Sequence, residues 1–328
     1  MKFLKRHLFL LMLILIIITL GLFETKNYLQ KQEQTKNEIK NNELAIQKIN
    51  ETKELETKYQ KCLEKPFLSI DTANSIKLFL DKYSSSDFAI YFEDINNNYT
   101  ITKNENTLFY GASLIKLFDA AYLIEKAINN EINLETETVE YLSKYVRAYS
   151  DNMAEHKIGD KVSLKDLISY ILLTSDNSAH EMLFDYIGAN NLKDYAKTLG
   201  VNLTINDYDH FGYLTAEDTH KILEKIYYLI NLDNEYSDLL KDNMSNTYFN
   251  SLNFDNITIL HKYGSYDPYF HDIGIYNNPD YPYFISIMTT IGEQASPNKI
   301  TELHKKIKKI YDTNLEQKEE YCYKMTYN

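Results

Sequence analysis

The chain has 328 residues, of which 44% are hydrophobic and 25% charged, a composition that suits one large or two small globular domains with additional segments. Its formal net charge of −12 at pH 7 argues against a nucleic-acid-binding protein, because such proteins normally present basic side chains to the phosphates. We therefore expect no nucleic acid or other polyanion as a partner.

The first 23 residues have the pattern of a signal sequence or a membrane anchor. Basic side chains at positions 2, 5 and 6 precede an almost wholly apolar run over residues 8–23. No small-x-small cleavage site follows this run, and no cysteine there can take a lipid. We predict an uncleaved single-pass anchor, with the N-terminus in the cytoplasm and the rest of the chain outside it. The alternative is a cleaved signal peptide, which would make the protein secreted.

Residues 24–66 are rich in Glu, Lys, Gln and Asn, and their apolar positions match only fragments of a heptad. This pattern predicts an extracytoplasmic stalk, helical or loosely ordered, that ends at Pro66. A coiled-coil dimer is the less favoured reading, and we expect a monomer. The stalk would hold a folded domain over residues 67–328 away from the membrane.

The folded domain has strand patterns at both ends and helical patterns between them. Phe88, Ile90 and Phe92 alternate with a period of two, and the turn residues 95–99 separate that strand from a second one. Three more strands are predicted within 256–265, 271–278 and 281–292, followed by a helix from Ser296. We predict an α+β fold in which an antiparallel sheet of about five strands is flanked by helices, with an all-helical lobe inserted between strands.

Residues 111–128 are predicted to form an apolar helix that nevertheless carries Ser113 and Lys116. Positions three apart lie on one face of a helix, so the hydroxyl and the amine can meet. Apolar neighbours disfavour the charged ammonium and lower the lysine pKa, and an amine of that kind can activate a hydroxyl as a nucleophile. The alternative is that Ser113 caps the helix while Lys116 reaches solvent.

Two later stretches carry groups that suit the same chemistry. Ser175, Asp176 and Asn177 stand at the start of a predicted helix, where all three residue types are also common as caps. Lys262 and Gly264 lie in the predicted strand HKYGS, where a lysine could instead serve to protect a sheet edge from aggregation.

These S-x-x-K, S-D-N and K-x-G stretches, in this order and at this spacing, resemble those of the class A β-lactamases and the related penicillin-binding proteins. The resemblance covers about residues 70–311. It implies that Ser113 attacks a carbonyl to form an acyl-enzyme, with Lys116 as its base or proton relay. It also implies that Ser175, helped by Lys262, passes a proton to the leaving nitrogen.

The resemblance assigns the remaining site residues to substrate binding. Asn177 would hold the amide side chain of the substrate. The backbone N–H groups of Ser113 and Ser265 would form an oxyanion hole, with Gly264 beside them on the strand. Lys262 and the Ser265 hydroxyl would receive a substrate carboxylate.

The sequence departs from that family at two places. Tyr263 stands where the family has Thr or Ser, which puts the substrate range in doubt. The family loop that carries a deacylating glutamate is missing between the second and third motifs. Asp207, Asp209 and His210 are possible replacements, but each is equally a turn residue beside Gly212, and we assign the role to none of them.

Two cysteines, Cys62 and Cys322, bracket the folded domain. In the resembled fold the first and last helices lie side by side, which implies a possible disulfide outside the cytoplasm; two separate thiols are the alternative. The eight histidines are scattered and form no ligand pattern, so we expect no metal and no cofactor.

The sequence therefore predicts a serine hydrolase that forms an acyl-enzyme on β-lactams or on D-alanyl peptides of the cell wall. The alternative is a penicillin-binding or cell-wall-binding sensor module that is acylated slowly or has no catalytic activity.

Overall fold

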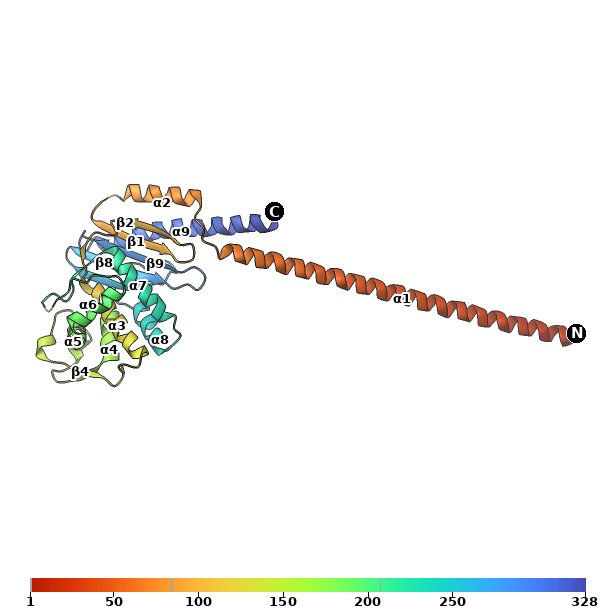
Figure 1. Cartoon of the computed structure of the whole chain (residues 1–328), viewed down its shortest axis with the longest axis horizontal. Coiled ribbons are helices and arrows are strands. Elements are labelled where there is room, and N and C mark those ends of the chain that lie inside the picture. Colours follow the sequence, from red (N-terminus) through yellow and green to blue (C-terminus); the bar gives the residue numbers. More distant parts are fainter. Residues whose placement is uncertain (1, 84, 207) are drawn as a thin grey trace. The chain divides into compact units, whose positions relative to one another are not determined.

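The computed structural model describes residues 2–83, 85–206 and 208–328, and Figure 1 shows its helices and strands. Two compact units are present. One comprises the N-terminal helix up to Glu64 with the final residues Tyr321–Asn328, and the other comprises Lys65–Glu320.

The first unit is built on helix α1 (Lys2–Leu63), which includes both the predicted anchor and the predicted stalk. In the described part of the chain this is the one helix long and apolar enough to cross a membrane, and its apolar window has no burial inside the protein. Such a helix is compatible with a signal anchor. The end of α1 is joined to the end of helix α9 (Ser296–Tyr327) by a disulfide between Cys62 and Cys322, with 5.6 Å between their Cα atoms.

The second unit contains the predicted antiparallel sheet, in the strand order β2-β1-β9-β8-β7. The register places Ile90 opposite Ile287, so strands from the two ends of the domain pair directly. The α+β prediction, with about five antiparallel strands and helices inserted between them, is confirmed. The strands are β1 (Phe88–Asp94), β2 (Tyr99–Lys103), β7 (Leu260–Tyr266), β8 (Tyr269–Tyr276) and β9 (Tyr283–Thr289).

Each face of the sheet is covered by helices because the side chains of its strands are apolar in both directions. On one face, helix α2 (Ile70–Lys82) and α9 contribute Phe79, Ile300, Leu303 and Ile307 to a buried cluster with the strands. Burying each such side chain contributes about 1.5–3 kcal/mol. The helical lobe covers the other face through a separate buried cluster (Figure 1).

The helical lobe lies between β2 and β7 in the chain. The side chains of Ser163, Asp176 and Thr215 each accept a backbone N–H bond in the first turn of a helix, which fixes where α4, α5 and α7 begin. The lobe helices are α3 (Lys116–Ile128), α4 (Leu164–Leu173), α5 (Asn177–Ile187), α6 (Ala189–Thr198), α7 (Ala216–Ile230) and α8 (Glu235–Ser245). Two small sheets join β3 (Phe109–Tyr110) to β6 (Tyr213–Leu214) and β4 (Thr138–Glu140) to β5 (Lys161–Ser163).

The segment predicted as one helix over 111–128 begins differently. Its first turn is the 3₁₀ helix η1 (Ala112–Ile115), and α3 starts only at Lys116. Ala112 has a φ of 44°, in the left-handed region that a residue with a Cβ rarely adopts. A Cβ at Gly111 would lie 3.0 Å from the Phe211 carbonyl oxygen, so this tight entry requires glycine.

Candidate active site

Ser113 and Lys116 meet where η1 passes into α3. The Lys116 side chain is fully buried, and its Nζ lies 3.0 Å from Ser113 Oγ. The same Nζ donates to the Ser175 carbonyl oxygen at 2.6 Å and to Asn177 Oδ1 at 2.7 Å. The alternative in which Lys116 reaches solvent is therefore not what the structure shows.

Burial lowers the pKa of the Lys116 ammonium to about 7, although the carboxylates of Asp176, Asp119 and Glu181 oppose the shift. A substantial fraction of this amine is neutral at physiological pH. A neutral amine has a lone pair that can accept the proton of the Ser113 hydroxyl.

Ser175 and Asn177 approach Lys116 because of the way α5 begins. Ser175 has a φ of 60°, which turns the chain sharply between α4 and α5. Asp176 is the residue that caps the helix, since its side chain accepts from Ala179 N and from Met153 N, each at 2.9 Å. Of the three residues in the S-D-N stretch, only the middle one is used as the cap, and the outer two contact the buried amine.

Lys262, on strand β7, approaches the same hydroxyl from the sheet. Its Nζ donates to Ser175 Oγ at 2.9 Å, while Lys116 Nζ lies 3.2 Å from that oxygen. Burial and the nearby Lys116 ammonium hold the pKa of Lys262 well below its usual value, with Asp272 opposing. Although β7 is an edge strand, a fully buried lysine cannot act as a solvent-exposed guard against aggregation.

Gly264 allows β7 to pack closely against η1. A Cβ at this position would lie 3.0 Å from the Gly111 carbonyl oxygen and 3.1 Å from Leu114 Cγ. The next residue, Ser265, is thereby held beside the turn that carries Ser113, and its hydroxyl donates to a carboxylate oxygen of Glu293.

Two cavities open onto Ser113. One of about 300 Å³ is lined by Tyr110, Ala112, Ser113, Arg147, Ala148, Tyr149, Asn177, Glu181, Phe211, Ser265 and Tyr266. The other, of about 680 Å³, is lined by Ser113, Tyr149, Thr174, Ser175, Asn177, Phe249, Tyr263, Ser265, Tyr266, Asp267, Phe270 and Glu293. Ser113, Asn177 and Ser265 thus line both cavities, and Ser175 lines the larger one. The buried amines of Lys116 and Lys262 line neither cavity but contact the hydroxyls of Ser113 and Ser175.

Comparison with known families agrees with this arrangement. Residues 71–313 match the family described as Beta-lactamase enzyme family, which accounts for well over half of the chain. This protein belongs to the beta-lactamase enzyme family. A search of curated proteins found no match.

Solved structures with a similar fold include PBP-A and several β-lactamases. PBP-A has a TM-score of 0.67 at 18% identity, covering 76% of this chain and 98% of its own. The TLA-3 extended-spectrum beta-lactamase has a TM-score of 0.63 at 20% identity, covering 75% and 98%. A beta-lactamase from Chitinophaga pinensis has a TM-score of 0.63 at 17% identity, covering 74% and 99%. At these identities the likeness concerns the fold of this beta-lactamase family member.

The three sequence candidates for a deacylation base lie between α6 and α7. Asp207 is outside the described residues. Asp209 Oδ1 accepts from the backbone N–H groups of Phe211 and Gly212, each at 3.1 Å, as a turn residue does. His210 Nδ1 lies 2.9 Å from Glu181 Oε1, and neither Asp209 nor His210 is among the residues that line the two cavities described above.

Glu181 is a cavity residue that the sequence analysis missed. It lies four residues after Asn177 on α5, so the two share a helix face, and this spacing was the available signal. Arg147 Nη2 donates to Glu181 Oε2 at 2.7 Å. Burial tends to raise the Glu181 pKa, but the bond from His210 and the charge of Arg147 hold it below its usual value. Glu181 is therefore an ionised carboxylate with a partner on each oxygen.

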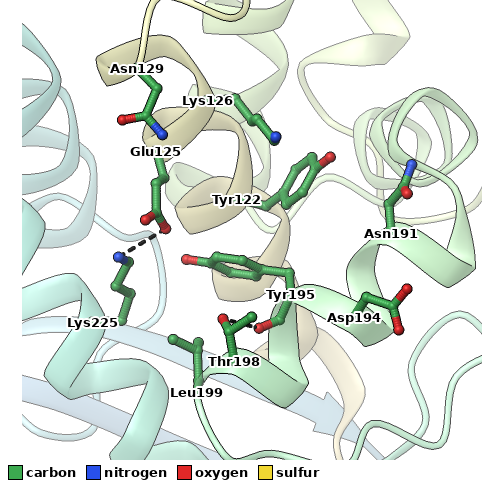
Figure 2. A pocket seen from close by; sticks show the side chains of 10 residues that line it. All are labelled: Tyr122, Glu125, Lys126, Asn129, Asn191, Asp194, Tyr195, Thr198, Leu199 and Lys225. Atoms are coloured by element: carbon green, nitrogen blue, oxygen red, sulfur yellow. Dashed lines mark hydrogen bonds and ion pairs between the residues drawn. The ribbon is translucent and has the colours of Figure 1, made fainter.

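Figure 2 shows a further cavity, of about 530 Å³, on α3, α6 and α7. Within it Lys225 pairs with Glu125 at 2.8 Å, and the Thr198 hydroxyl donates to the Tyr195 carbonyl oxygen at 2.6 Å. The Tyr195 hydroxyl is buried without a hydrogen-bond partner among the described residues. The cavity contains none of the predicted site residues.

Proposed function

We propose that this protein is a serine hydrolase whose Ser113 forms an acyl-enzyme with β-lactams or with D-alanyl peptides of the cell wall. The observation that carries the proposal is the 3.0 Å contact between Ser113 Oγ and the fully buried Lys116 amine, at the wall of two cavities. Membership of the beta-lactamase enzyme family supports it.

In the proposed reaction the neutral Lys116 amine takes the Ser113 proton as Ser113 Oγ attacks the carbonyl carbon of the substrate. The carbonyl oxygen gains the negative charge, and the backbone N–H groups of Ser113 and Ser265 stabilise it. The carbon–nitrogen bond then breaks, and the nitrogen takes a proton from the Ser175 hydroxyl. Lys116 or Lys262, at 3.2 and 2.9 Å, replaces the Ser175 proton.

The Asn177 side chain is hydrogen-bonded at both its oxygen and its nitrogen. Its Oδ1 accepts from Lys116 and its Nδ2 donates to the Ala148 carbonyl oxygen at 3.0 Å, so both ends of this cavity-lining amide are held. We propose that the amide side chain of the substrate binds along this residue.

Hydrolysis of the acyl-enzyme is the step for which the site is less well equipped. Among the described residues that line the two cavities, the carboxylates are Glu181, Asp267 and Glu293. Both oxygens of Glu181 are already bonded, and Glu293 accepts from the Ser265 hydroxyl. An unactivated water slows such a step by about a hundredfold to ten-thousandfold. This observation favours the second candidate function, a penicillin-binding or cell-wall-binding sensor that holds its acyl group.

The N-terminal helix and the disulfide bear on the location of the protein in the cell. We propose that α1 anchors the protein in the cell membrane and that the catalytic unit lies outside the cytoplasm. The disulfide between Cys62 and Cys322 suits an oxidising compartment.

A fluorescent penicillin tests the proposal and separates the two functions. Labelling that requires Ser113 and is absent in Ser113→Ala supports acylation, with Ser75→Ala, an exposed serine of α2, as the matched control. Label lost within minutes indicates a hydrolase, and label retained for hours indicates a sensor or binding protein. Absence of label on the wild-type protein would contradict both functions.

A further inference from the structure

The larger cavity beside Ser113 has an acidic wall. Among the described residues that line it, the charged side chains are Asp267 and Glu293, and both are carboxylates. Arg147, the basic residue at Ser113, lines the other cavity and is paired with Glu181.

Glu293 takes up the hydroxyl that would otherwise meet a substrate carboxylate. The Ser265 hydroxyl donates its hydrogen to a carboxylate oxygen of Glu293. A serine hydroxyl has one hydrogen to donate, so Ser265 in this arrangement has none for a second anion. An anion beside Ser265 would also stand next to the negative charge of Glu293.

The nearby amine of Lys262 is covered. Its side chain is fully buried and lines neither cavity, whereas the adjacent Tyr263 lines the larger cavity. Lys262 Nζ donates to the Tyr263 carbonyl oxygen at 2.8 Å and lies 4.4 Å from the centroid of the Tyr263 ring. Phe249 and Phe270 pack around that ring, so the tyrosine is held over the amine.

The basic side chain that strand β8 places next to Gly264 is uncharged. His271 lies opposite Gly264 in the register of β7 and β8. It is fully buried, and burial lowers its pKa to about 4 despite its bond to the Tyr110 carbonyl oxygen, so the ring is neutral at pH 7.

We propose that Glu293, with Tyr263 covering Lys262, makes this site select acyl donors whose group beside Ser265 is neutral or cationic and discriminate against a free carboxylate there. The inference rests on the proposed function and narrows its substrate class. Penicillins and D-alanyl chain ends carry a carboxylate next to the amide nitrogen that leaves. The preferred donors are then their esters, amides or amine-bearing relatives.

The test compares a penicillin that has a free carboxylate with its methyl ester, using mass spectrometry of the intact protein to measure the rate of Ser113 acylation. We expect the wild-type protein to react with the ester at least as fast as with the acid. Glu293→Gln should raise the ratio of acid rate to ester rate by about tenfold, because it removes the opposing charge and retains a hydrogen-bonding partner for Ser265. Glu140→Gln, an exposed carboxylate on β4 that lines neither cavity, makes the same change in net charge and should leave the ratio unchanged.

Salt dependence of the wild-type protein gives a second readout that needs no variant. Raising the ionic strength from about 20 mM to about 300 mM should raise the acid rate relative to the ester rate, because salt screens repulsion between exposed charges. A ratio that is unchanged by Glu293→Gln and that does not rise with salt would overturn the inference while acylation itself stands. Absence of any Ser113 adduct with both compounds would instead overturn the proposed function, and this inference with it.

Discussion

Two regions of the molecule lie beside Ser113, and their polar side chains make different kinds of contact. One region is formed by the S-x-x-K, S-D-N and K-x-G segments, and the other is the loop between α6 and α7. In the three motif segments, the Ser113 hydroxyl contacts the buried amine of Lys116, and the Ser175 hydroxyl contacts the buried amines of both Lys116 and Lys262. These distances are between 2.9 and 3.2 Å, short enough for direct proton transfer. In the loop, Asp209 stabilises its own turn and His210 binds Glu181. The residues that we propose for acylation therefore contact one another, whereas Asp209 and His210 use their side chains to hold the loop.

The largest effect is expected from removal of the buried Lys116 amine. Lys116→Met should lower the rate of Ser113 acylation by about a hundredfold to ten-thousandfold, because it removes the base that accepts the serine proton. Lys126→Met, on the same helix as Lys116, breaks a surface ion pair with Glu131 and should leave the rate within twofold. Acylation is measured with the fluorescent penicillin, and a Lys116→Met rate close to that of the wild type would exclude Lys116 as the base.

The rate of acylation should also depend on pH through the same amine. Since burial places the Lys116 pKa at about 7, the fraction of neutral amine falls about tenfold for each pH unit below that value. The acylation rate should therefore rise with pH from 5 to about 7 and level off above it. Stopped-flow measurements over this range check the profile, and a rate that is constant below pH 7 would contradict the assignment.

Substitution of Glu181 tests whether this carboxylate takes part in hydrolysis of the acyl-enzyme or only holds the loop between α6 and α7. Because both of its oxygens are bonded, to His210 and to Arg147, we expect Glu181→Gln to act on the loop rather than on the reacting water. The variant should lose about 1–3 kcal/mol of unfolding free energy, and its rate of label loss should change by less than about tenfold. Urea denaturation and a label-chase measurement check the two values. A hundredfold slower loss of label at normal stability would show that Glu181 is the deacylation base.

The smallest effect is expected at Asp209. Asp209→Ala removes an acceptor of two backbone N–H groups and should cost about 1 kcal/mol of stability, whereas Asp209→Asn keeps an acceptor and should cost less. Both variants should leave the rate of label loss within about threefold of the wild type. A much larger fall in both would mean that the Asp209 carboxylate takes part in the chemistry.

Much of the fold could be predicted from the sequence because its signals are local. The period-two alternation of Phe88, Ile90 and Phe92 and the apolar face of Ile300, Leu303 and Ile307 depend on residues a few positions apart, and the structure buries all six side chains. The helical start at residue 111 was wrong in detail. The 3₁₀ turn there begins beside Gly111, where a Cβ would lie 3.0 Å from the carbonyl oxygen of Phe211, a hundred positions away in the chain.

The amino-acid sequence was enough to propose which groups take part in the chemistry, since Ser113 and Lys116 are three positions apart and the S-D-N and K-x-G stretches are short. What surrounds those groups depends on the three-dimensional fold. The pairing of Glu181 with His210, the bond from Ser265 to Glu293 and the packing of Phe249 against Tyr263 each join separate elements of the fold. Such contacts form when packed helices and strands bring distant side chains together, and no local spacing in the sequence encodes them.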